Sequence, residues 1–256
     1  MNADEIKLFF EEHGYYHAKR VFTGDPLNNL AEDYDRIVNQ LVRSGDELNA
    51  RWTNPEAMKK MKSEDSVILH TNNVQQYSGQ WMSALFHPNF LFYANALLGE
   101  DVVLHHTKLF QKPPSVGAPF PMHQDWSYFP TLKDSMLAGI MHLTEATNEM
   151  GCLRVYPGSH RLGRIPNSNG QVKSEFLEKY PMENATILEA EPGDIVFFHY
   201  FTLHGSMPNV SEKTRKTVLI QLYAGDDVTE PGIDHPDEKL VLSGWNYHAS
   251  RSNTAQ

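Results

Sequence analysis

From Gly99 onward the chain consists of short runs of β-branched and aromatic residues separated by Gly, Pro, Asn and Asp. Such runs are typical of strands joined by turns, at the spacing of an all-β sandwich or barrel. The regular strand–helix alternation that would indicate a parallel sheet is not found here. This part of the chain therefore predicts a β-sandwich or jelly-roll. The runs are VVLHHTKLFQK, SMLAGIMHLTEA, GCLRVYPGSH, ATILEAEPGDIVFFHY and RKTVLIQLYAGDD.

The first hundred residues have mainly the pattern of helices. Apolar residues recur at helical spacing over 5–14, 26–45 and 88–98, and a glycine closes each stretch. Residues 15–21 fit a short strand, 51–80 are polar without a clear pattern, and the tail after Trp245 has weak structural signals. We expect one domain over 1–256, with a helical N-terminal support (1–100), a jelly-roll core (101–225) and a C-terminal extension (226–256).

Composition argues against several classes of protein. No apolar run approaches the roughly 18 residues that a membrane span needs, and the start of the chain lacks a targeting pattern. The formal net charge of −10 argues against binding to nucleic acid or to an anionic membrane. The lone cysteine, Cys152, cannot form an internal disulfide or a thiolate metal site. We expect a soluble, globular, cytoplasmic protein.

Histidine is over-represented, with 13 residues in the chain, about twice the ordinary share. In MHQDWSYF, His123 and Asp125 are separated by one residue, so on an extended segment both side chains point to the same face. Imidazole with carboxylate suits Fe, Mn or Zn. Further along, His204 and Ser206 are again two apart. The pattern indicates a metal site.

Arg215 follows eleven residues after His204, past the turn-rich segment MPNVSEK, and opens the apolar strand KTVLIQLYA. If the chain turns back after MPNVSEK and the next strand runs antiparallel, Arg215 is brought toward Ser206. Two histidines and one carboxylate form the facial triad of non-haem Fe(II) oxygenases, which leaves three positions open. The ferrous site then has a net charge of +1 and attracts a dianion such as 2-oxoglutarate. Arginine binds its remote carboxylate as a planar fork, and Ser206 can donate a second hydrogen bond.

The segments HTKLFQKPP, MHQDWSYFP, GCLRVYPGSH and GDIVFFHYFTLHGS, with a later Asn and Arg, resemble the phytanoyl-CoA dioxygenase family of Fe(II)/2-oxoglutarate-dependent oxygenases. The resemblance spans about 102–225 and implies a double-stranded β-helix (jelly-roll, cupin-like) core with flanking helices. It implies iron ligands at His123, Asp125 and His204, a 2-oxoglutarate clamp at Arg215 and Ser206, and Lys108 beside the co-substrate. Met141 stands where some members carry a tryptophan that packs against 2-oxoglutarate.

The resemblance implies a dioxygenase that uses Fe(II), 2-oxoglutarate and O2 and oxidises a small-molecule C–H bond, most often by hydroxylation, releasing succinate and CO2. Epimerisation, desaturation or ring formation in secondary metabolism remain open, as does a non-catalytic metal- or ligand-binding jelly-roll. A zinc hydrolase would have no evident reason to keep Arg215. A halogenase would need a small residue in place of Asp125, so that interpretation is rejected.

The substrate and the oligomeric state are not defined by the sequence. A partly apolar pocket is suggested by four residues, which favour a small natural-product-like molecule: Phe110, Trp126, Tyr128 and Met141. His105 and His106 are consecutive, so on a regular strand only one of them points inward, and His106 shares its face with Lys108.

Overall fold

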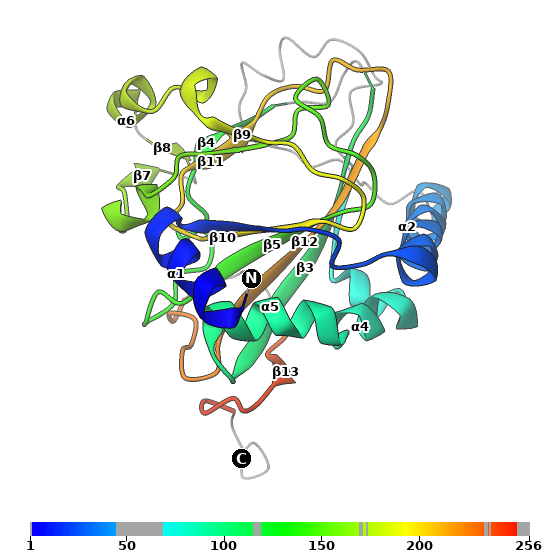
Figure 1. Cartoon of the computed structure of the whole chain (residues 1–256), viewed down its shortest axis with the longest axis horizontal. Coiled ribbons are helices and arrows are strands. Elements are labelled where there is room, and N and C mark those ends of the chain that lie inside the picture. Colours follow the sequence, from blue (N-terminus) through cyan, green and yellow to red (C-terminus); the bar gives the residue numbers. More distant parts are fainter. Residues whose placement is uncertain are drawn as a thin grey trace.

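Two antiparallel sheets face each other in the computed structural model, which describes residues 2–44, 69–114, 119–168, 171–172, 174–232, 235 and 237–249 (Figure 1). The larger sheet has the order β1 (Tyr15–Ala18), β10 (Ile195–His199), β5 (Leu137–His142), β12 (Arg215–Ala224), β3 (Val102–Lys112), β13 (Leu240–Ser243), and β2 (Leu69–Asn72) also pairs with β3. The smaller sheet has the order β4 (Phe120–His123), β11 (His204–Ser206), β6 (Leu153–Val155), β9 (Thr186–Leu188). The predicted jelly-roll is confirmed.

The predicted N-terminal helices are confirmed as α1 (Ala3–His13), α2 (Gly24–Ser44) and α5 (Pro88–Leu98). Their ends follow from local chemistry. Asn2 and Glu5 form a capping box at the start of α1, and Gly14 ends that helix with a left-handed φ of 74°. The predicted strand at 15–21 is β1, shorter than expected.

Part of the polar stretch 51–80 lies outside the described residues. The remainder holds β2, the 3-10 turn η1 (Val74–Gln76) and the start of α4 (Gly79–Leu85). The other small elements are η2 (Ser159–Leu162), the pair β7 (Asn167–Ser168) and β8 (Gln171–Val172), α6 (Ser174–Lys179) and η3 (Met182–Asn184). Strands β1, β2 and β13 come from outside residues 101–225, so the larger sheet takes strands from both flanking segments.

The N-terminal helices cover one face of the larger sheet (Figure 1). On β12, Val218, Ile220 and Leu222 pack into the core that this face shares with the helices. The residues between them point to the opposite face, because side chains alternate along a strand. Arg215 and Thr217 thereby face the smaller sheet, and the space between the sheets is left for the site.

Strand β3 changes face at a β-bulge. Gln221 pairs with His106 and Leu222 pairs with Leu104, so His105 is an extra residue without a partner in the register. Leu104 packs toward the helices, whereas His106 lines the space between the sheets. As expected, His106 lines this space together with Lys108 and His105 does not, but the bulge brings both rings to the same aromatic neighbour. Both rings contact Phe129, with centroid separations of 5.2 and 5.4 Å.

No helix in the described part of the chain is long and apolar enough to cross a membrane.

Candidate active site

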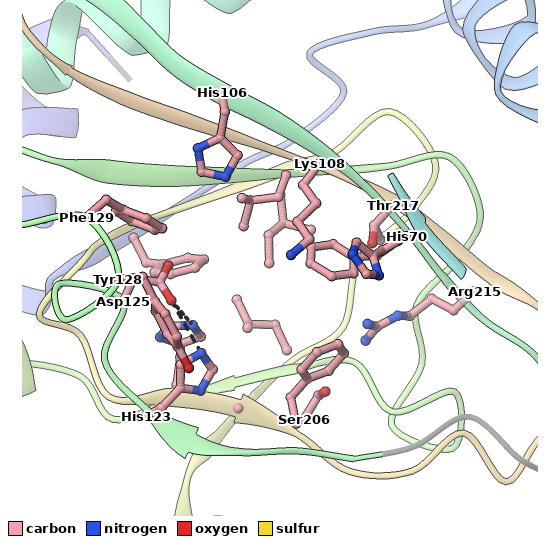
Figure 2. A pocket seen from close by; sticks show the side chains of 18 of the residues that line it. His70, His106, Lys108, His123, Asp125, Tyr128, Phe129, Ser206, Arg215 and Thr217 are labelled. Carbon is pink, nitrogen blue, oxygen red and sulfur yellow. Dashed lines mark ion pairs between the residues drawn. The ribbon is translucent and has the colours of Figure 1, made fainter. Parts of the chain in front are cut away.

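A cavity of about 350 Å³ lies between the two sheets (Figure 2). The structure places all six residues singled out from the sequence on its wall: Lys108, His123, Asp125, His204, Ser206 and Arg215. Lys108 and Arg215 come from the larger sheet, and the others come from the smaller sheet or the bend that follows β4. The jelly-roll thus brings together side chains separated by up to about a hundred residues in sequence.

The register of the smaller sheet places His204 directly opposite His123. Asp125 lies just past the end of β4, where its backbone N–H donates to the Tyr200 carbonyl at 2.9 Å. Its Oδ1 is 3.3 Å from His123 Nε2 and 3.4 Å from His204 Nε2. Three ligand atoms thus converge on one point, and all three residues are buried.

Hydrogen bonds to backbone carbonyls define which ring nitrogens face that point. His123 Nδ1–H donates to the Pro121 carbonyl at 2.7 Å, and His204 Nδ1–H donates to the Thr202 carbonyl at 2.9 Å. In neutral rings each Nε2 then carries a lone pair directed at the Asp125 carboxylate. Carbonyl partners of this kind orient metal-bound histidines.

The charge states of these groups suit a metal. Burial alone would raise the pKa of Asp125, but positive charge and hydrogen bonds from His204 and His123, when these rings are protonated, lower it below its usual value, and a metal cation would take the place of those protons. Burial and then the neighbouring His204 lower the pKa of His123. Two neutral imidazoles and a carboxylate are the metal-binding forms, and without a cation their lone pairs would repel. Ligands about 2.1 Å from an octahedral ion lie about 3.0 Å apart, close to the observed separations. The set fits Fe(II).

Arg215 lines the other end of the cavity, and a second buried basic residue, Lys112, is paired with it in the sheet and bonded to the lining residue Ser206. Arg215 is 7% exposed, its guanidinium donates to the Gly151 carbonyl, and its Nε has no partner among the described residues. Burial lowers its pKa to about 10. Directly opposite in register, Lys112 is fully buried, and its Nζ donates to Ser206 Oγ at 2.6 Å and to the Met207 carbonyl at 2.7 Å.

No described carboxylate forms an ion pair with Arg215 or Lys112, although both are buried. Burial and then the charge of Arg215 lower the pKa of Lys112 well below its usual value. Buried charges are costly unless they are paired. This end of the cavity therefore fits an anion, and the co-substrate's remote carboxylate supplies one. Lys112 was missed from the sequence, because only the pairing of β3 with β12 reveals that it faces Arg215.

Arg215 reaches the cavity by a route that differs from the predicted one. Strands β11 and β12 belong to different sheets, so the chain does not return as a hairpin. The connection crosses from the smaller sheet to the larger one, and Arg215 faces Ser206 across the cavity (Figure 2).

The expectation that Met141 borders the pocket is wrong. Met141 packs in the core toward the helices, whereas its neighbours Ile140 and His142 line the cavity. His142 is missed by the sequence argument. It is buried, and neither ring nitrogen has a hydrogen-bond partner in the described part of the chain. Of the predicted apolar wall, Phe110 and Tyr128 line the cavity, whereas Trp126 lies against the guanidinium of Arg164 at 5.2 Å.

Two histidines with lowered pKa values, the buried His142 and the partly buried His199, predict that the protein loses stability in acid. Burial lowers the pKa of His142 to about 3 and that of His199 to about 4. The unfolded chain, with histidine near its ordinary pKa, binds these protons first as the pH falls below about 6.5. Each group then reduces the free energy of unfolding by about 1.4 kcal/mol per pH unit. We expect Tm to fall steadily from pH 6.5 to pH 4.5.

Thermal unfolding across this pH range checks the prediction. His142→Leu should flatten the pH dependence of Tm, since it removes one titrating ring that makes no hydrogen bond to any described residue. A Tm that stays constant between pH 7 and pH 5 would contradict it.

Comparisons with known proteins agree with this site. The family model for phytanoyl-CoA dioxygenase (PhyH) matches residues 10–217. A probable alpha-ketoglutarate-dependent hypophosphite dioxygenase of Stutzerimonas stutzeri is 34% identical, covering 95% of this chain and 87% of its own. A 1-deoxypentalenic acid 11-beta-hydroxylase of Streptomyces exfoliatus is 26% identical, covering 82% and 76%.

The fold agrees as well. The crystal structure of the non-heme alpha ketoglutarate dependent carbocyclase SnoK superimposes with a TM-score of 0.75 at 23% identity, covering 94% of this chain and 95% of its own. The chain belongs to the phytanoyl-CoA dioxygenase family, and it is an Fe(II)- and 2-oxoglutarate-dependent oxygenase.

Proposed function

We propose that His123, Asp125 and His204 hold the Fe(II) and that Arg215 and Ser206 hold the remote carboxylate of 2-oxoglutarate. One observation carries this proposal: a convergent His–Asp–His set shares a cavity with the buried Arg215, which lacks a described carboxylate partner. When bound, iron with 2-oxoglutarate and O2 supplies the oxidising chemistry and releases succinate and CO2.

The chain's own residues position the reactants. The carbonyls of Pro121 and Thr202 fix both imidazoles in the tautomer that offers Nε2 to the metal. Ser206 Oγ accepts a hydrogen bond from Lys112, so its own hydroxyl proton is available to donate to the co-substrate. Arg215 supplies charge and a planar fork at the far end.

Lys108 is proposed to lie beside the co-substrate. Its side chain extends into the cavity from β3, and its Nζ lies 5.2 Å from the centre of the Phe110 ring (Figure 2). Burial lowers its pKa, and the charge of Asp125 opposes this effect. The described lining residues include two basic side chains, Lys108 and Arg215, but one carboxylate, Asp125. The whole chain, by contrast, has a net charge of −10. This local excess of positive charge favours anionic reactants.

The substrate is proposed to be a small molecule of secondary metabolism that is hydroxylated at a C–H bond. Two observations support this choice: apolar and aromatic walls at Phe110, Tyr128 and Phe129, and relatives named for pentalenic acid hydroxylation and nogalamycin biosynthesis. Epimerisation or ring formation on the same scaffold is the second candidate, favoured by the neighbours named as an epimerase and a carbocyclase.

Succinate formation tests the proposal. The purified chain is incubated with Fe(II), 2-oxoglutarate and O2, and the amount of succinate formed is measured with and without candidate substrates. We expect slow succinate release that a true substrate accelerates, with one oxidised product per succinate. No succinate with any candidate, in protein shown to bind iron, would favour the non-catalytic alternative.

Replacement of Lys112 by methionine should weaken 2-oxoglutarate binding about tenfold or more, since a lost hydrogen bond to a charged group is worth about 1.5–3 kcal/mol. The variant keeps the volume of the side chain but removes the amine that holds the Ser206 hydroxyl. Iron binding should stay at the wild-type level.

Anaerobic titration of the Fe(II)-loaded protein with 2-oxoglutarate measures this effect. Lys179→Met, at an exposed position on α6, is the matched control. An unchanged 2-oxoglutarate Kd in Lys112→Met would show that Ser206 is positioned without Lys112.

A further inference from the structure

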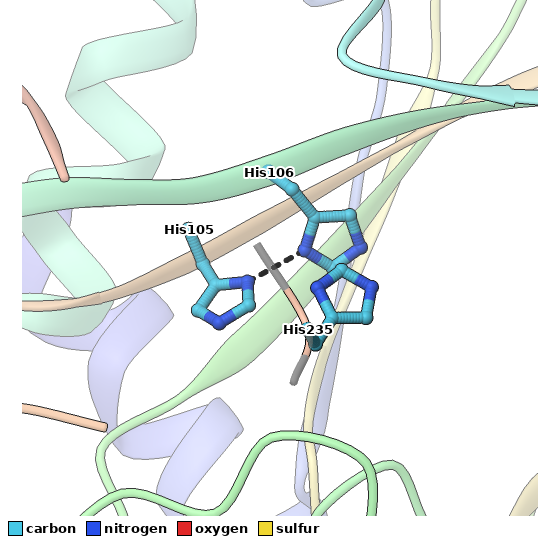
Figure 3. A group of neighbouring side chains, drawn as sticks. All are labelled: His105, His106 and His235. Atoms are coloured by element: carbon cyan, nitrogen blue, oxygen red, sulfur yellow. Dashed lines mark hydrogen bonds between the residues drawn. The ribbon is translucent and has the colours of Figure 1, made fainter. Parts of the chain in front are cut away.

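A second group of histidines lies outside the proposed iron site (Figure 3). His105 and His106 come from the bulge in β3, and His235 comes from the segment between β12 and β13. One ring nitrogen of each lies within 4.8 Å of the others. Their ring centroids are separated by 4.9 Å (His105–His106), 5.3 Å (His105–His235) and 4.3 Å (His106–His235).

The two β3 rings face each other because of the bulge. Their Nδ1 atoms are 2.7 Å apart, and both side chains are buried. A hydrogen bond between the rings accounts for this contact, but it leaves His105 Nε2 buried without a partner among the described residues. Burial lowers the pKa of His105 to about 3 and that of His106 well below its usual value. Both rings are therefore neutral, the form in which imidazole binds metals.

The spacing suits a tetrahedral ion. Zinc–nitrogen bonds of 2.0–2.1 Å place two nitrogens of a tetrahedral site about 3.3 Å apart. The observed separations, from 2.7 Å between the two Nδ1 atoms to at most 4.8 Å, lie on both sides of this value. Three imidazoles without a carboxylate favour zinc over ferrous iron.

We propose that His105, His106 and His235 bind a second divalent metal ion of the zinc type. The ion joins the segment that carries His235 to the bulge of β3, across 130 residues of sequence (235 − 105). His106 and His235 also line the cavity, so the ion fastens part of its wall. Three protein ligands leave a fourth position for water or another oxygen.

Zinc stoichiometry tests this site separately from the iron site. The full-length chain is stripped of metal, titrated with Zn(II) and desalted, and bound zinc is counted by elemental analysis. We expect two equivalents in the wild type, one in His235→Ala, one in His204→Ala and none in the double variant. Exposed His248→Ala is the matched control and should keep two.

Affinity gives a second readout. Loss of His235 should weaken the binding of the second zinc equivalent about 100-fold or more. Removing only a residue that supports a ligand already lowers metal affinity 10- to 100-fold. Co(II) should give the intense visible bands of a tetrahedral ion in His204→Ala and lose them in the double variant. His235 is only partly buried, so this variant should fold, and its circular dichroism and Tm check this.

One zinc equivalent in the wild type that His235→Ala retains, or two in both His235→Ala and His105→Ala, would overturn the proposal and leave the group as hydrogen-bonded imidazoles.

Discussion

Replacing His204 with alanine is expected to abolish 2-oxoglutarate turnover. The substitution removes one of the three ligand atoms that meet at Asp125 Oδ1 and leaves the metal with two. Loss of a residue that merely supports a ligand costs 10- to 100-fold in metal affinity, so loss of the ligand itself should cost about 100-fold or more. Succinate formation should fall with the bound iron.

Iron content after anaerobic loading and succinate release under air measure both effects. His248→Ala, an exposed histidine far along the chain, is the control and should bind iron as the wild type does. Full turnover in His204→Ala would reject the ligand set.

Replacing Arg215 with alanine is expected to weaken 2-oxoglutarate binding by two or more orders of magnitude. The guanidinium is buried, it is anchored to the Gly151 carbonyl, and no described carboxylate pairs with it. Removing one partner of a buried charge pair costs several kcal/mol, and about 1.4 kcal/mol corresponds to tenfold in affinity. Arg215→Lys should recover only part of the loss, because lysine lacks the bidentate fork.

Iron affinity should change little in Arg215→Ala, since the guanidinium lies at the other end of the cavity from the triad (Figure 2). An anaerobic titration followed by visible absorption separates the two effects. At 100 times its Kd, 2-oxoglutarate should stabilise the wild type by about 2.7 kcal/mol and thereby raise its Tm. This increase in Tm should also disappear in Arg215→Ala. Wild-type affinity in the variant would mean that Lys108 or Lys112 holds the carboxylate.

Most secondary structure could be predicted because its signals are local. The two long strands are mostly buried and contain short apolar runs, VVL at the start of β3 and VLI within β12. Strand β2, with the sequence LHTN, has no such pattern. It is a strand because β3 offers it an edge, and that pairing is a tertiary contact. The bulge at His105 likewise depends on the partner strand β12.

The candidate site was predictable where its residues are close in sequence. His123 and Asp125 are two apart, and so are His204 and Ser206, so local geometry is enough. Lys112 and His142 were not predictable, because strand pairing alone brings them to the site. Lys112 pairs with Arg215, and His142 pairs with Thr217, which lies two residues further along β12. Met141 was misplaced because a shift of one residue along a strand moves a side chain to the opposite face.

The most direct test of the iron and co-substrate assignments is anomalous X-ray diffraction from crystals grown anaerobically with Fe(II) and 2-oxoglutarate. The predicted result is an iron peak about 2.0–2.2 Å from Nε2 of His123, Nε2 of His204 and a carboxylate oxygen of Asp125, with the remote carboxylate of 2-oxoglutarate on Arg215 and Ser206. An iron peak away from these three residues, or a co-substrate carboxylate that does not contact Arg215, would contradict the assignment.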